Sequence, residues 1–113
     1  MAFSTSDVTA KVRRIIGDNF EPYRWEDAEI REHLQTAIKR LNVNVPSTRY
    51  IGDDMVDYIE LPEDADADIS IHDSYEEALV YYVVHLCYTK DDPDTSNAEL
   101  AAAYFTRADG LMR

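Results

Sequence analysis

The stretch from Ser74 to Thr89, SYEEALVYYVVHLCYT, is almost entirely apolar or aromatic after its first four residues. It is too long for an average strand, and it opens with residues that mostly favour helices. Asp73 followed by Glu76 has the pattern of a capping box. A buried strand is the rival interpretation, because Val and Tyr favour strands. The combined signals favour a helix from Ser74 to Thr89.

This helix lacks the single apolar stripe that a surface helix carries. In a chain of 113 residues, the remaining elements cannot easily cover every side of it. Two arrangements stay open. Either the helix is central and wrapped by the others, or one side packs on the core and another on a neighbouring subunit. Tyrosine suits the second arrangement, because its ring can be buried while its hydroxyl stays in water.

Two helices are predicted in the N-terminal half of the chain. The first runs from Asp7 to Ile16, with Ser6 as its cap and Gly17 as its stop. The second runs from Trp25 or Glu26 to Leu41. Apolar residues at helical spacing predict that its buried face consists of Ile30, Leu34, Ala37, Ile38 and Leu41.

The segment after the second helix does not have helical periodicity. Asn42 and Pro46 are expected to end the helix. Tyr50–Ile51 and Val56–Leu61 are expected to form a short hairpin, with alternate residues facing opposite sides. Glu63–Asp68 is expected to be an exposed acidic loop.

The last helix is predicted from Asn97 to Leu111, opened by a capping box from Ser96 to Glu99. Its buried face is predicted to consist of Leu100, Ala103 or Tyr104, Ala108 and Leu111. The connector 90–95 is short and polar, so this helix should fold back on the preceding one. The sequence therefore predicts one mainly α domain. Its expected form is a four-helix antiparallel bundle with a short hairpin and acidic loop between the second and third helices.

The charge is strongly acidic and unevenly placed. Asp and Glu total 23 and Lys and Arg 11, which gives a net charge of −12. Residues 50–89 hold eleven of the acidic side chains and no Lys or Arg. Such a surface repels nucleic-acid phosphates. The lone Cys87 excludes an intrachain disulfide, and no run resembles a signal peptide or a membrane span. We therefore expect a cytoplasmic site of synthesis.

Motifs for metal binding or catalysis are weak. Asp64, Asp66 and Asp68 have the opening spacing of a calcium loop, but Ile69 and Tyr75 replace the required Gly and Glu. No two of His33, His72 and His85 are spaced as metal ligands on one helix face. Cys87 lies two residues after His85, which on a helix points the two side chains apart. No phosphate-binding glycine loop or nucleophile elbow occurs. We expect no enzyme activity, no metal and no cofactor.

The sequence Tyr75–Arg107 resembles the paired-helix core of the head–tail adaptor proteins of tailed bacteriophages, also called head-completion or connector proteins. The shared features are an Ala- and Leu-containing helix with Tyr, a Lys-Asp turn, and a helix with spaced Ala, Tyr and Phe. The N-terminal half is similar more loosely. It has a short helix, then Arg24–Ile30 opening a longer helix, then an extended stretch.

The resemblance implies a ring of about twelve copies that docks on the portal protein and continues the DNA channel. A tail tube or nozzle protein would attach to this ring, and DNA would pass through it without specific binding. The resemblance implies no membrane partner. It implies a place in the virion, at the junction of head and tail.

Under this interpretation three groups of residues have distinct expected roles. The expected channel-facing acids are Asp64, Asp66 and Asp68, the expected subunit-interface residues are Tyr81, Tyr88 and Tyr104, and the expected portal-docking residues are Leu111, Met112 and Arg113. Residues 1–4 are the alternative docking element. Two other functions stay open: an acidic DNA-mimic inhibitor, and a general helical protein-interaction domain.

Overall fold

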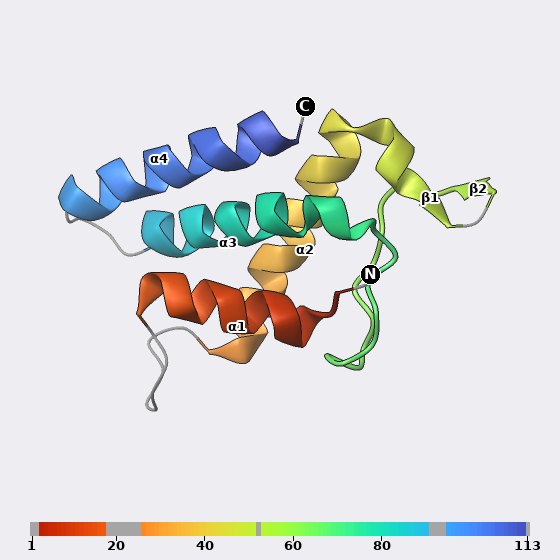
Figure 1. Cartoon of the computed structure of the whole chain (residues 1–113), viewed down its shortest axis with the longest axis horizontal. Coiled ribbons are helices and arrows are strands. Elements are labelled where there is room, and N and C mark those ends of the chain that lie inside the picture. Colours follow the sequence, from red (N-terminus) through yellow and green to blue (C-terminus); the bar gives the residue numbers. More distant parts are fainter. Residues whose placement is uncertain (1–2, 18–25, 52, 91–94, 113) are drawn as a thin grey trace.

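The computed structural model describes residues 3–17, 26–51, 53–90 and 95–112, with the backbone alone at 89, 90 and 95–98. Four helices make up most of this part of the chain, and a small antiparallel sheet lies between the second and third (Figure 1). The prediction of a mainly helical fold with a strand-containing insert is confirmed. The elements are α1 Thr5–Ile16, α2 Asp27–Asn44, β1 Tyr50–Ile51, β2 Asp54–Met55, α3 Glu76–Lys90 and α4 Thr95–Leu111, with 3-10 helices at Pro46–Arg49 and Asp73–Tyr75.

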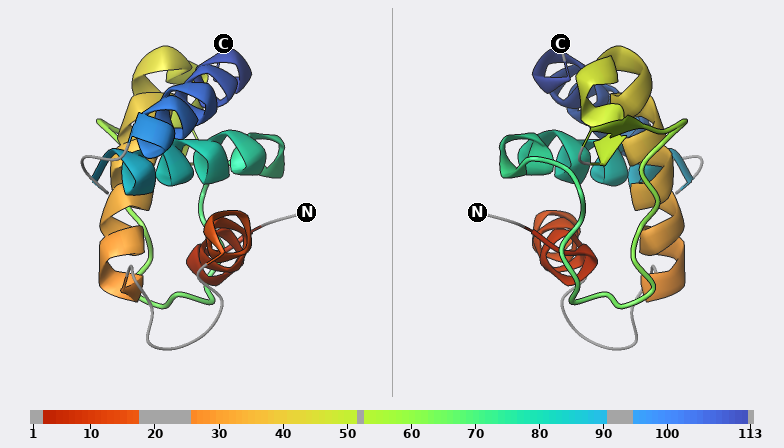
Figure 2. Two further views of the ribbon diagram at one scale, coloured as in Figure 1. Left: turned by 90° about the vertical axis from the view of Figure 1, so that its left-hand side faces the viewer. Right: turned by 90° about the vertical axis from the view of Figure 1, so that its right-hand side faces the viewer.

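Helix α3 occupies the middle of the molecule, and α1, α2 and α4 all pack on it. Helix α4 returns along α3 in the opposite direction, as predicted (Figure 1). Helix α1 runs in the same general direction as α3, and α2 crosses both of them (Figures 1 and 2). A regular antiparallel four-helix bundle is therefore not confirmed.

The apolar character of α3 explains its central place. Its fully or almost fully buried side chains spread over more than one face, and they are Ala78, Leu79, Val80, Val83, Val84 and Cys87. Each large apolar side chain that is removed from water contributes on the order of 1.5–3 kcal/mol. A helix of this kind is stable only when partners cover most of its circumference.

The cap of α1 lies earlier than predicted. Ser4 Oγ accepts a hydrogen bond from the Asp7 amide at 3.2 Å, and the Asp7 carboxylate accepts from the Ser4 amide at 2.9 Å. The predicted cap at Ser6 is therefore wrong, because Ser4 and Asp7 form the same reciprocal pattern two residues earlier. The predicted stop is confirmed: Gly17 adopts a left-handed conformation with φ of 74°.

The start of α3 also differs from the prediction. A 3-10 turn, Asp73–Tyr75, precedes the helix, and His72 caps that turn by accepting a hydrogen bond from the Ser74 amide at 3.1 Å. Asp73 is therefore not the cap. An imidazole in the cap position is a rare choice that capping patterns based on Ser, Thr, Asp and Asn do not detect.

The predicted apolar face of α2 is confirmed, since all five of its residues are completely buried. The helix continues past the expected Leu41 to Asn44, and it ends before Pro46 as expected. Asn42 does not stop the helix. It is buried, donates to Thr48 Oγ1 at 2.8 Å and accepts from the Ile59 amide at 2.8 Å.

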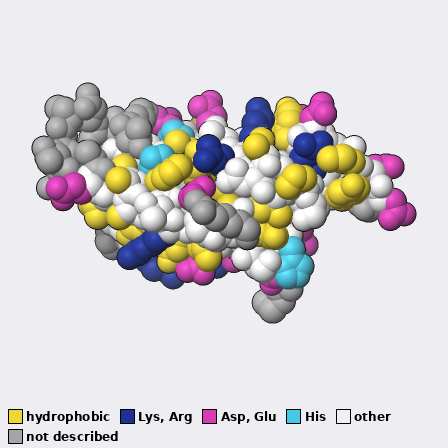
Figure 3. Space-filling view, turned by 90° about the horizontal axis from the view of Figure 1, so that it is seen from above, with side chains coloured by type: hydrophobic (Ala, Val, Ile, Leu, Met, Phe, Trp, Pro, Cys, Tyr) yellow, Lys and Arg dark blue, Asp and Glu magenta, His cyan; other side chains and the backbone are white. Residues whose placement is uncertain are grey.

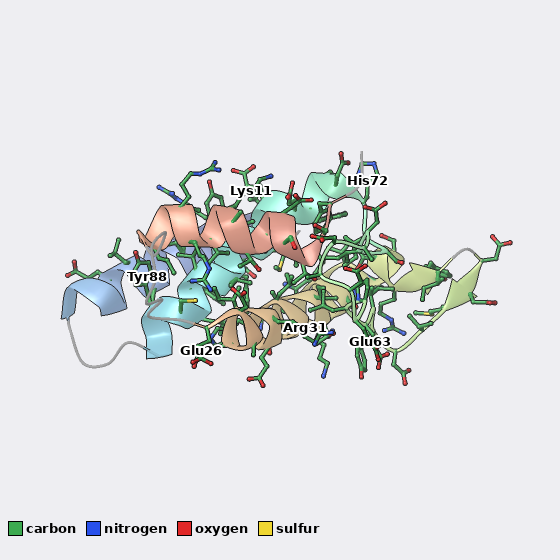
Figure 4. All side chains as sticks on the ribbon, turned by 90° about the horizontal axis from the view of Figure 1, so that it is seen from below. Lys11, Glu26, Arg31, Glu63, His72 and Tyr88 are labelled. Carbon is green, nitrogen blue, oxygen red and sulfur yellow. The ribbon has the colours of Figure 1, made fainter. Side chains whose placement is uncertain are left out.

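Asn42 belongs to a row of polar side chains on α2 that holds the segment 59–62. Gln35 donates to the Ile59 carbonyl and accepts from the Leu61 amide, both at 2.9 Å. Arg31, which lies close to this segment in Figure 4, donates to the Leu61 and Pro62 carbonyls. These side chains provide the hydrogen bonds that a neighbouring strand would provide. The predicted strand 56–61 is thus replaced by an extended segment, in which Ile59 and Leu61 are buried.

The buried face of α4 is rotated relative to the prediction. Ala101, Ala108 and Met112 are buried, whereas Leu100 and Leu111 are 41% and 44% exposed. Small alanine side chains allow the backbone of α4 to approach the bulky side chains of α3 closely. The helix begins at Thr95, so Ser96 lies inside its first turn and not before it.

Replacing Asn42 by alanine tests the polar row on α2. The change leaves the Ile59 amide buried without its acceptor, so we expect the free energy of unfolding to fall by about 2–3 kcal/mol. The matched control is Asn44→Ala on the same helix, which is exposed and should change stability by less than about 0.5 kcal/mol. Urea denaturation measures both. Equal effects of the two substitutions would contradict the role assigned to Asn42.

Candidate assembly interface

Three tyrosines predicted to lie at a subunit interface are close together. Tyr81 and Tyr88 are one heptad apart on α3, and Tyr104 comes from α4. The Tyr104 ring lies 5.7 Å from the Tyr81 ring and is stacked on the Tyr88 ring at 6.1 Å, measured between centroids. All three side chains are half-buried. The chain therefore brings their rings into one cluster and leaves part of each accessible.

Arg107 completes this cluster. Its guanidinium lies 5.4 Å from the centroid of the Tyr104 ring and 5.8 Å from that of Tyr81. No carboxylate of the described residues lies within ion-pair distance of it. On α4, Leu100 and Leu111 are spaced to share an edge with Tyr104 and Arg107. We call the surface made by Tyr81, Tyr88, Leu100, Tyr104, Arg107 and Leu111 the tyrosine strip.

A second group of aromatic side chains packs the other edge of α4 against α3. Tyr82, His85 and Phe105 have ring centroids 5.0–6.2 Å apart. His85 Nδ1 donates to the Ala101 carbonyl at 2.8 Å, which fixes the protonated nitrogen. Arg40 of α2 lies over the Phe105 ring. Aromatic contacts on both edges of α4 thus pack it against α3. They hold the α4 residues of the tyrosine strip in place beside those of α3.

The predicted channel-facing acids lie beside the start of α1. Ser6 donates through its hydroxyl to Asp66 at 2.8 Å and through its amide to the Ala65 carbonyl at 2.9 Å. Asp68 forms an antiparallel bridge with Ser4, and Asp64 accepts from the Asp66 amide at 2.9 Å. Carboxylates near a helix N-terminus are favoured by the helix dipole. The acidic loop is therefore exposed, as predicted, but its backbone is fixed.

The predicted docking elements are only partly accessible. Leu111 is exposed, but Met112 is completely buried in the core. Its side chain therefore cannot dock in this conformation, because α4 is rotated relative to the prediction. Arg113 lies outside the described residues, as do Met1 and Ala2. Phe3 is also buried, and its carbonyl accepts from the Ile69 amide, so the alternative N-terminal element is largely packed.

Two further polar features lie elsewhere in the described chain. A cleft of about 540 Å³ between α1 and α3 contains the ion pair of Lys11 and Glu76 at 2.8 Å. The described residues contain no group of three or more metal-binding side chains. His33 Nε2 is buried without a hydrogen-bond partner in the described part, and burial lowers the pKa of His33. This pKa shift favours the neutral form, as expected for a packed histidine.

Comparisons with known proteins identify no relative: no protein-family model, no curated protein and no solved structure matches the chain. Among the described helices, none is long and apolar enough to cross a membrane.

The Tyr81 hydroxyl provides a test of the strip's geometry. A hydrogen bond to Glu77 raises the pKa of Tyr81 above its ordinary value of 10.0, because the phenol proton is held by a carboxylate. Glu77→Gln should therefore lower the Tyr81 pKa, measured by NMR titration of ¹³C-labelled tyrosine. The control is Glu76→Gln, since Glu76 pairs with Lys11. A Tyr81 pKa that both variants leave unchanged would contradict the hydrogen bond.

Proposed function

We propose that the chain is a structural subunit of the head–tail adaptor ring of a tailed bacteriophage. In this role it docks on the portal protein, extends the DNA channel and provides the attachment site for the tail. It would be made in the cytoplasm of the bacterial host and reside in the neck of the virion. The proposal includes no catalysis and no cofactor. It starts from the resemblance of Tyr75–Arg107 to the adaptor family.

The tyrosine strip carries the proposal. Aromatic residues and arginine are enriched in protein interfaces, and the residues that dominate binding energy are often Tyr, Trp and Arg. The strip combines three tyrosines, two exposed leucines and Arg107, which has no acidic partner among the described residues. Covering such a surface with a neighbouring subunit would bury the rings and give Arg107 an anionic partner. A ring subunit needs a surface of this kind.

The acidic loop supports the second part of the proposal. Asp64, Asp66 and Asp68 are exposed, and the bonds to Ser4 and Ser6 fix their backbone. Carboxylates repel DNA phosphates, so a channel wall that carries them would let DNA slide without being gripped. We propose that this loop faces the channel. Loss of the three charges should then affect DNA passage more than assembly.

Inactivating the gene in its phage tests the function. An amber codon in place of Tyr75 should yield DNA-packaged heads and free tails that do not join, seen by electron microscopy of the lysate. A plasmid that expresses the wild-type chain should restore tailed particles. A plasmid with Tyr104→Phe, which keeps the aromatic ring, should also restore tailed particles, whereas one with Tyr104→Asp should not.

Normal tailed particles without the chain would refute the adaptor role. A purified monomer that inhibits DNA-binding enzymes would then favour the DNA mimic. Binding to another protein without either effect would favour a general interaction domain.

A further inference from the structure

The hairpin formed by β1 and β2 exposes large apolar side chains. Tyr50, Ile51 and Met55 are 47%, 52% and 51% exposed, although each strand has only two residues. The base of the hairpin is fixed, since Val56 donates to the Arg49 carbonyl at 2.8 Å and Arg49 Nε donates to the Val56 carbonyl at 3.0 Å. A firmly held hairpin with apolar side chains in water is typical of a docking element.

Acidic side chains surround these apolar groups. Asp53, Asp54 and Asp57 are exposed, and none has a hydrogen bond or ion pair to a described side chain. Figure 3 shows hydrophobic side chains gathered at this end of the molecule, with Asp and Glu side chains beyond them. The hairpin surface, defined as Tyr50, Ile51, Asp53, Asp54, Met55 and Asp57, is therefore both apolar and anionic.

The tyrosine strip has the complementary character. It is aromatic and apolar, and Arg107 supplies a cation without a carboxylate partner in the described chain. A shallow surface cleft of about 450 Å³ lies beside one end of it, lined by Glu77, Tyr81, Thr106, Arg107, Gly110 and Leu111. The hairpin surface could lie against this cleft with one of its carboxylates directed at Arg107. Arginine binds carboxylates through paired hydrogen bonds that fix the orientation of the partner.

The two surfaces cannot meet within one chain. The molecule is 45 Å long, and the hairpin projects at the end away from α4 (Figure 1). Tyr88 lies at the opposite end from the hairpin and from Glu63 (Figure 4). Contact between the surfaces therefore needs a second copy, and it joins two different surfaces of the two copies.

We propose that the hairpin surface of one copy docks in the cleft beside Arg107 of the next copy. Such a head-to-tail contact repeats around a ring when the rotation between copies closes. Hairpin-to-hairpin pairing would bring six carboxylates together, and strip-to-strip pairing would set Arg107 against Arg107, so like charges disfavour both. The ring rests on the proposed function, but the contact itself rests only on these two surfaces.

This contact gives the two acidic segments different roles. One acid of the hairpin would pair with Arg107 of a neighbour, while those of the loop 63–68 would stay in water.

Cross-linking of two single-cysteine variants tests the contact. Ile51→Cys and Leu111→Cys are prepared separately in the full chain, mixed, and treated with a short bismaleimide. We expect the mixed dimer to exceed each like-with-like dimer by about tenfold, because only the mixture joins hairpin to strip. The wild type, whose Cys87 is buried, is the control for background. Equal amounts of the three dimers, or none of them, would overturn the proposal.

A charge exchange tests the role of Arg107. Arg107→Asp and Asp54→Arg should each weaken self-association about tenfold in sedimentation equilibrium, and a mixture of the two variants should recover it. Arg14→Asp on α1 is the matched control, since Arg14 is exposed and outside the strip. Circular dichroism confirms that each variant is folded. Failure of the mixture to recover association would contradict the pairing.

The contact and the proposed function fail in different ways. A double variant carries Arg107→Asp and Leu111→Asp in the strip. If it still assembles on the portal, the proposed contact is wrong and the adaptor role stands. If head-to-tail dimers form but the phage does not need the chain, the contact stands and the adaptor role falls.

Discussion

The fold depends on the burial of α3, a helix with apolar residues on nearly every side. Val83, Val84 and Cys87 are completely buried, and one neighbour cannot cover a helix of this kind. Helices α1, α2 and α4 therefore pack around it, in a crossing arrangement and not in a regular bundle. The tyrosines flank the contact with α4, where a large ring can be partly buried while its hydroxyl reaches water. The same constraint that organises the core thus creates the edge that we assign to assembly.

Local patterns in the sequence predicted where the four helices lie, but not their N-terminal caps. The apolar spacing from Ile30 to Leu41 and the stop at Gly17 are confirmed. Two predictions that needed a distant partner were wrong. Asn42 was expected to end the helix, because asparagine is common at helix ends. Its hydrogen bond with the Ile59 amide, 17 residues away, is not visible in the local pattern. Residues 56–61 resembled a strand because alternation reports which side is buried, but not whether the bonds go to a strand or to side chains of α2.

The sequence also predicted part of the candidate interface, namely that three tyrosines come together. Tyr81 and Tyr88 share a face because they are seven residues apart, and an antiparallel α4 brings Tyr104 beside them. Of the expected docking residues, Met112 is buried and Leu111 is exposed, because α4 is rotated relative to the predicted helix phase. The sequence did not suggest the hairpin that we propose as a docking surface, because Asp53 and Asp54 made it resemble a solvated turn. Only the exposure of Tyr50, Ile51 and Met55 reveals its apolar side.

Electron microscopy of the chain mixed with the portal ring of its own phage tests the adaptor role most directly. The account predicts a second ring beneath the portal. In that ring the acidic loop 63–68 should face the lumen and the hairpin of each subunit should touch α4 of its neighbour. The protein alone and the portal alone serve as controls. Portal rings without added density, at concentrations where the chain is folded, would contradict the account.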